Sequence, residues 1–168
     1  LNFLDHHIKC GNAIVGLAHF KELENGIANE AFRTLPNDDK EIAATFRNKN
    51  KAERKTKGQL GIYDLTNANE SLDKIRNKFS EFVNMPEEKP EEIAAKAEAY
   101  KKLTSGKGWW RLKQLADLQV AQFFIPKTEE NKEMLTTDAK YRTYLNSGAQ
   151  IQDRGAAMAK SAEKRFFH

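Results

Sequence analysis

The chain has 168 residues, of which 39% are hydrophobic and 31% charged, and its formal net charge is +4. No apolar run approaches the roughly 18 residues that a membrane-spanning helix needs, so no membrane segment is expected. The single cysteine excludes an internal disulfide and a multi-cysteine metal site and is typical of a reducing cytoplasm. The small positive surplus permits an anionic partner without requiring one.

Residues 1–17 have the pattern of a short strand followed by a turn. Short apolar runs are broken at Gly11–Asn12 and at Gly16. The adjacent His6 and His7 would point to opposite faces of a strand, and no helical pair of ligands accompanies them, so no metal site is predicted. The chain begins inside this apolar pattern without an initiator Met or signal-peptide architecture, and we expect it to be a piece of a larger protein.

Residues 18–168 have helical periodicity. Apolar residues recur at steps of three and four, and Asn, Asp, Gly and Pro mark the ends of the predicted helices. These helices run from Asn37 or Asp38 to about Lys57, from Asn67 or Asn69 to about Met85, from Glu87 to Gly106, from Trp109 to Pro126, from Thr137 to Leu145 and from Gln150 to Phe167. The fourth is apolar around most of its circumference, which is typical of the central helix of a core. The sequence therefore predicts a mainly α protein, a helical bundle of about five to six helices preceded by a short strand and loop.

A basic run lies in the second half of the first predicted helix. Only Glu53 opposes it, and its cations are Arg47, Lys49, Lys51, Arg54, Lys55 and Lys57. Such a run could follow a phosphate backbone. A solvated helix face is the more usual outcome, so both interpretations stay open at this point.

The segment "TSGKGWW" offers two weaker candidates. Its Gly-Lys-Gly lacks the spacing, the following hydroxyl residue and the preceding strand of a phosphate-binding loop, so it predicts a loop between two helices. Trp109 and Trp110 could stack on an unpaired base, although an aromatic pair at the start of a helix is more often buried in the core. Composition and periodicity alone thus indicate a helical domain without an assigned function.

The opening stretch, "LNFLDHHIKCGNAIVG", resembles a segment of large adenine-specific DNA methyltransferases of restriction-modification and related phage-defence systems. That segment typically reads Leu-Ser-Phe-Leu-Asp-His-His-(Ile/Leu)-(Lys/Arg)-Cys-Gly-(Asp/Asn)-Ser-Leu-(Ile/Val)-Gly, and this chain departs from it at Asn2 and at Ala13–Ile14. Further stretches resemble the family in the same order: "GIANEAF" followed by "DDKEIAATFRNKNKAER", then "LADLQVAQFFIPK", and finally "KRFFH".

The resemblance implies a division of the chain at residue 17. These enzymes have a Rossmann-like core that binds S-adenosylmethionine, and a long helical insertion separates its cofactor-binding half from an Asn-Pro-Pro-aromatic catalytic motif. Residues 1–17 match a stub of that core, and residues 18–168 match the insertion. Neither the glycine-rich cofactor loop nor the Asn-Pro-Pro motif occurs in this sequence. The fragment alone is therefore expected to be inactive and to bind no cofactor, with DNA and the remainder of the methyltransferase chain as partners in a bacterial or archaeal cytoplasm.

The same resemblance assigns a cofactor-side role to Cys10, Gly11 and Asn12. Ligands of open α/β sheets bind beyond the carboxyl ends of the strands, where these residues would lie. The side-chain carbonyl of Asn12 would accept a hydrogen bond from the amino group of the cofactor's adenine, and Gly11 would permit a close backbone approach. Without the resemblance, a plain turn is the preferred interpretation. Strand residues within 1–17 without their sheet neighbours would favour self-association through that segment.

Two classes of function stay open. The first is a helical insertion of a DNA methyltransferase that either contacts DNA or links the core to target-recognition or nuclease parts. The second is a stand-alone helical module that binds another protein. The reading frame on either side of the chain distinguishes them, because cofactor and Asn-Pro-Pro motifs there would establish the first.

Overall fold

The computed structural model describes residues 16, 17, 19, 21–56, 62–147 and 151, and within these ranges the regular structure is entirely helical. The helices are α1 (Lys21–Glu24), η2 (Asn29–Phe32, 3-10), α2 (Lys40–Lys55), α3 (Ile62–Val83), α4 (Pro90–Ser105), α5 (Lys107–Ala121), η3 (Glu129–Met134, 3-10) and α6 (Asp138–Ser147). The mainly α prediction is confirmed. None of the helices in these ranges is long and apolar enough to cross a membrane. The strand and loop predicted within residues 1–17, and nearly all of the helix predicted over 150–167, lie outside the described residues.

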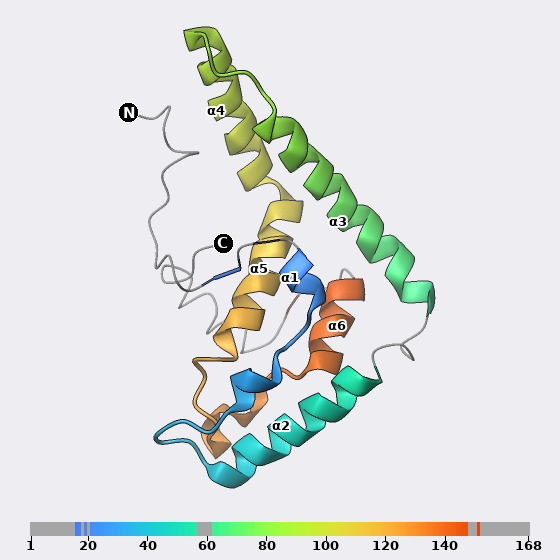
Figure 1. Ribbon diagram of the computed structural model, residues 1–168, viewed down its shortest axis with the longest axis vertical. Helices are drawn as coiled ribbons and strands as arrows, with labels where there is room; N and C mark the ends of the chain where they lie inside the picture. The colour runs from blue at the N-terminus through green and yellow to red at the C-terminus, as the bar shows by residue number, and fades with distance from the viewer. Residues whose placement is uncertain (1–15, 18, 20, 57–61, 148–150, 152–168) are drawn as a thin grey trace.

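The helices form a body and an arm. The arm consists of α3 and α4, which run antiparallel and are joined by the turn over residues 84–89 (Figure 1). Helix α4 continues almost in line into α5, which enters the body, where α1 and α6 pack against it. Helix α2 packs against η2 and α6, and α3 also packs against α6. Helix α2 lies at the end of the molecule opposite the turn between α3 and α4 (Figure 1).

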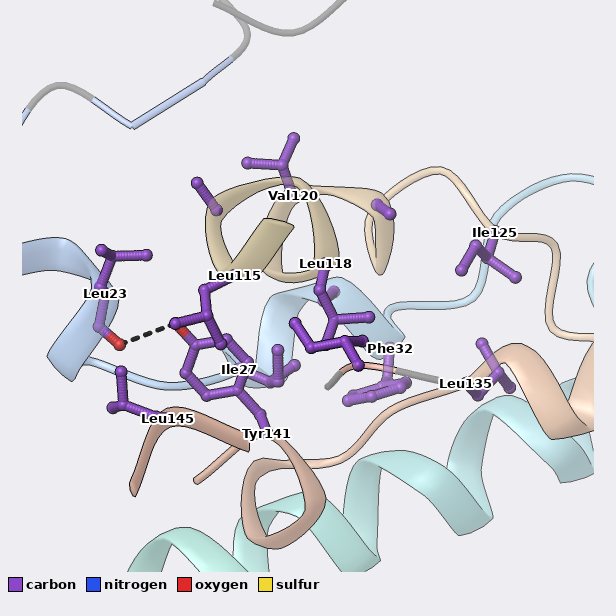
Figure 2. Packing of buried hydrophobic residues seen from close by; sticks show 14 of the residues in the cluster. Leu23, Ile27, Phe32, Leu115, Leu118, Val120, Ile125, Leu135, Tyr141 and Leu145 are labelled. Carbon is purple, nitrogen blue, oxygen red and sulfur yellow. Dashed lines mark hydrogen bonds between the residues drawn. The ribbon is translucent and has the colours of Figure 1, made fainter. Parts of the chain in front are cut away.

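Helix α5 forms the centre of the core, as its apolar circumference predicts. Every residue from Leu115 to Ala121 is buried. Figure 2 shows Leu115 and Leu118 packed toward the side chains of Ile27 and Phe32, just before and in η2, and of Tyr141 in α6. Full burial of a Leu, Ile or Phe side chain contributes about 1.5 to 3 kcal/mol, so this cluster is the main source of stability of the body.

The N-cap residue of α2 is neither of the two predicted residues, Asn37 and Asp38. Asp39 is the N-cap, and its carboxylate accepts hydrogen bonds from the amides of Glu41 (2.8 Å) and Ile42 (3.1 Å). Asn37 has a positive φ of 73° and precedes the helix. Asp38 instead accepts hydrogen bonds from the amides of Leu35 and Lys127. The predicted cap residue therefore binds a distant segment of the chain and does not cap α2.

Three other expectations need correction. Helix α3 begins at Ile62, before the predicted caps Asn67 and Asn69. The predicted loop around Gly106 is a break of a single residue, because Gly106 both ends α4 and caps α5. Trp110 is 48% exposed rather than buried, because it lies on the outer side of α5. The short helices α1, η2 and η3 have no counterpart among the predicted elements.

Candidate nucleic-acid interface

A row of cations lies along the solvent face of α2. Arg47, Lys51 and Lys55 follow one another at four-residue steps, so they lie on one side of the helix, and all three are exposed. In the part of the chain that the structure describes, none of the three forms an ion pair or a side-chain hydrogen bond. We call these three residues the basic row. Lys40, seven residues before Arg47 and also exposed, extends the row toward the start of α2; the seven-residue spacing is the signal that could have found it.

Lys49 does not belong to this row. It is exposed, but it lies two residues from both Arg47 and Lys51, which corresponds to a rotation of about 200° around the helix. A single nucleic-acid strand on the basic row would not reach it. Lys57 lies outside the described residues.

Arg54 has a different role from the basic row. Its Nη1 donates to the carbonyl oxygens of Asn25 (2.8 Å) and Ile27 (2.7 Å) and lies 3.8 Å from a carboxylate oxygen of Asp138. Its side chain is 33% exposed. The guanidinium therefore joins α2 to the segment before η2, and its interactions stabilise the fold rather than extend the row.

A buried polar cluster fixes how α2 is rotated against the body. The carboxylate of Asp138 accepts hydrogen bonds from the amide of Ile27 (3.0 Å) and from Nε of Arg142 (2.6 Å), and its own amide donates to Oδ1 of Asn50 (2.8 Å). Nδ2 of Asn50 donates to the carbonyl oxygen of Ile27 (3.0 Å). Because these groups are buried and mutually satisfied, the cluster orients the basic row outward. Both carboxylate oxygens of Asp138 thus accept hydrogen bonds within the fold.

Two more hydrogen bonds connect α5 and α6 to the segment that Arg54 contacts. The buried Tyr141 hydroxyl donates to the carbonyl oxygen of Leu23 (2.9 Å; Figure 2), and Nε2 of Gln119 donates to the carbonyl oxygen of Gly26 (2.7 Å). Burial raises the pKa of Tyr141 above its ordinary value of 10.0, so the hydroxyl remains a protonated donor in alkaline solution as well as at neutral pH. The segment from Leu23 to Ile27 is thus held by three helices at once.

An open cavity of about 660 Å³ lies next to Arg54, between α5 and the segment that leads into η2. Val120, Phe123 and Phe124 give it an apolar wall, and Glu22 is the carboxylate among its lining residues. The described lining contains no His or Cys.

The predicted cofactor residues Cys10, Gly11 and Asn12 lie outside the described residues, so the structure does not place them. Among the residues that it does place, no group of three or more His, Cys, Asp or Glu side chains is suited to hold a metal ion.

Comparison with known proteins gives no further guide to this surface. No protein-family model, curated protein or solved structure matches the chain.

Proposed function

We propose that this chain is the helical insertion of an adenine-specific DNA methyltransferase of the restriction-modification type, and that α2 contacts the DNA backbone. The observation that carries the DNA contact is the basic row, whose three cations are exposed, aligned and unpaired within the described chain. Aligned cations release counterions from DNA when they neutralise phosphates, which favours binding. Phosphate contacts of this kind position a protein on a duplex without reading its sequence.

The arrangement of the segments that carry the family resemblance supports the same proposal. Residues 26–32 and 38–54 lie far from residues 115–127 in the chain, yet Asn50 and Gln119 both hydrogen-bond to carbonyl oxygens of the segment at Gly26–Ile27. These three resembling segments thus build one common body, and the basic row is on its surface. In this proposal the domain is a scaffold that positions DNA, and S-adenosylmethionine is bound by the core to which Cys10, Gly11 and Asn12 belong.

Binding of the 168-residue chain to a short DNA duplex tests the proposed interface. Fluorescence anisotropy should show affinity that falls with salt, and the slope of log K against log salt should change by about 0.9 for each phosphate that is no longer neutralised. Replacement of Arg47 and Lys51 by Gln should therefore reduce the magnitude of that slope by about 1.8. Reversal of the same two residues to Glu should abolish binding.

The control for the Glu variant of Arg47 and Lys51 alters the net charge of the protein by the same amount at another place on its surface. Arg76→Glu with Lys101→Glu alters two exposed residues on the arm and should leave most of the affinity intact. If this pair weakens binding as much as the α2 pair, or if the unaltered chain does not bind DNA at low salt, the row is a plain solvated face and the DNA contact is wrong.

A stand-alone module for protein binding is the second candidate, and the groove along the arm described below favours it. The two candidates differ in their genomic context. A reading frame that carries a glycine-rich cofactor loop before this segment and an Asn-Pro-Pro motif after it would establish the methyltransferase, whereas a stop codon directly after His168 would favour the module.

A further inference from the structure

An open groove of about 460 Å³ runs between α3 and the line formed by α4 and α5. Its floor is apolar and is made by side chains from all three helices and the turn: Ile75, Phe82, Met85, Leu103 and Trp109. The volume lies within the range of about 300 to 1,000 Å³ that is typical of ligand sites. The groove belongs to the arm and takes no part in the proposed DNA contact.

Both ends of the groove are fixed by specific contacts. At the turn, Nζ of Lys96 donates to the carbonyl oxygens of Val83 (3.2 Å) and Met85 (3.1 Å) and pairs with Glu87. At the body end, Gly108 lies so close to α3 that a Cβ on it would be 2.6 Å from Cδ1 of Ile75. The helices therefore hold the groove open without a ligand, and such preorganisation lowers the entropic cost of binding.

The aromatic rings around the groove already pack against one another. Phe82 lies 5.6 Å from Tyr100, and Phe79 lies 5.3 Å from Trp109, between ring centroids. The ammonium of Lys96 lies 5.3 Å from the centroid of Phe82. Because ring faces are used within the arm, the groove suits apolar side chains better than stacked bases, which need open aromatic faces.

The edge of the groove is positively charged. Lys78, Lys102 and Lys107 are exposed along it, and Glu81 is the carboxylate among the lining residues. Within the described chain these three lysines form no ion pair. An apolar floor with an unneutralised basic edge is complementary to a partner that combines apolar anchors with carboxylates.

We propose that this groove binds an amphipathic helix of a partner protein, with apolar side chains at i, i+3 or i+4 and i+7 and with Asp or Glu beside them. The apolar side chains enter the floor, and the carboxylates lie against the lysines of the edge. Because the basic row of α2 lies at the other end of the molecule (Figure 1), the domain can hold DNA and this partner at the same time.

A designed peptide tests the proposal on the full chain. The probe is a fluorescein-labelled peptide of about 18 residues with leucines at the anchor positions and glutamates on either side of them. Anisotropy should show saturable binding of this peptide, and a peptide with lysine in place of each glutamate should not bind. No saturable binding of the acidic peptide would overturn the proposal.

Neighbouring substitutions distinguish the groove from general charge attraction. Lys102→Glu should weaken peptide binding about tenfold or more, whereas Lys101→Glu, an exposed neighbour outside the groove, should have little effect. Ala99→Phe should block the groove without a change of charge, and Ala94→Phe on the exposed side of α4 should not. Circular dichroism of each variant should remain unchanged.

Three outcomes would contradict the groove assignment. Equal reductions in affinity from Lys101→Glu and Lys102→Glu would mean non-specific attraction, and undiminished binding to the Ala99→Phe variant would place the peptide elsewhere. Displacement of the peptide by single-stranded DNA, with the same dependence on Lys102, would make the groove a nucleic-acid surface. Replacing Arg47 and Lys51 should leave peptide binding unchanged, so this test and the DNA test fail or succeed separately.

Discussion

Gly26 lies directly against Asp138 and Arg142 of the buried polar cluster. Its φ is 68°, a left-handed conformation that residues with a side chain rarely adopt, and its carbonyl oxygen accepts a hydrogen bond from Gln119. A Cβ at this position would lie 1.8 Å from Oδ1 of Asp138 and 2.7 Å from Nη2 of Arg142. Conformation and space therefore both require glycine here.

We expect Gly26→Ala to lower the free energy of unfolding by about 2 to 4 kcal/mol, because it adds backbone strain and displaces a buried ion pair. Urea denaturation followed by circular dichroism measures the change. Gly106→Ala is the matched control. Gly106 has a φ of −72°, and the nearest atom to an added Cβ is 3.4 Å away, so the change should stay below about 1 kcal/mol. Similar destabilisation of the two variants would refute the role of Gly26.

Lys127 is fully buried, and within the described chain its Nζ has no hydrogen-bond partner. Burial lowers the pKa of this ammonium, and the nearby Asp38 carboxylate offsets only part of that effect. Lys127→Met keeps most of the volume and removes the buried charge, so it should raise the free energy of unfolding by about 1 to 2 kcal/mol at neutral pH.

The difference in the free energy of unfolding between Lys127→Met and the unaltered protein should become smaller as the pH rises. Because the pKa of Lys127 is lower in the folded protein, the unfolded chain binds more protons as pH approaches 10.5, the ordinary value, and the stability of the unaltered protein rises there. Thermal melts of both proteins over this pH range test the sign. A stability difference that does not depend on pH would mean that the ammonium is not penalised in the fold.

At the scale of elements, hydrophobic periodicity was sufficient to find α2 to α6, although not the start of α3, and to identify α5 as the central helix. It failed where long-range contacts decide the outcome. Asp38 could not be excluded as a cap from the sequence, because the amide of Lys127 that binds it is 89 residues away. The helices α1 and η2 are too short to show a period, and the burial of Leu23 and Phe32 depends on packing against other elements.

In the candidate interface, too, the sequence did not reveal which side chains make long-range contacts. Composition identified the cations of α2 as one group, and the four-residue spacing of the basic row was visible in the sequence. The separation of Lys49 follows from helix geometry, but the engagement of Arg54 depends on the carbonyl oxygens of Asn25 and Ile27, which no local pattern reveals.

Lys96 connects the two helices of the arm, although its position in the middle of α4 is typical of a solvent-exposed lysine. It donates to the carbonyl oxygens of Val83, the last residue of α3, and of Met85, two residues further on. Lys96→Met should lower the free energy of unfolding by about 1 to 2 kcal/mol and should speed hydrogen exchange at the end of α3. The exposed Lys101→Met should do neither, and unchanged exchange in the Lys96 variant would mean that the turn does not depend on this interaction.

At the scale of the whole molecule, the division of the chain at residue 17 stays a prediction. Leu17 packs against the core of the body, so a truncation should retain it. Deletion of residues 1–15 should preserve the helical circular dichroism of the remainder, and light scattering should report a monomer even if the complete chain self-associates. Unfolding of the truncated protein would mean that the opening stretch belongs to the helical body.

The way in which the segment from Leu23 to Ile27 is held also has a consequence for synthesis on the ribosome. Its partners on α6 lie far along the chain: Tyr141 binds the carbonyl oxygen of Leu23 across 118 residues, and Asp138 binds the amide of Ile27 across 111. The turn between α3 and α4 is local in sequence and can form while translation continues, whereas the packing of α3 against α6 has to wait for α6. The body has to wait until α6 has left the exit tunnel, and until then the apolar side chains of α5 stay exposed to chaperones.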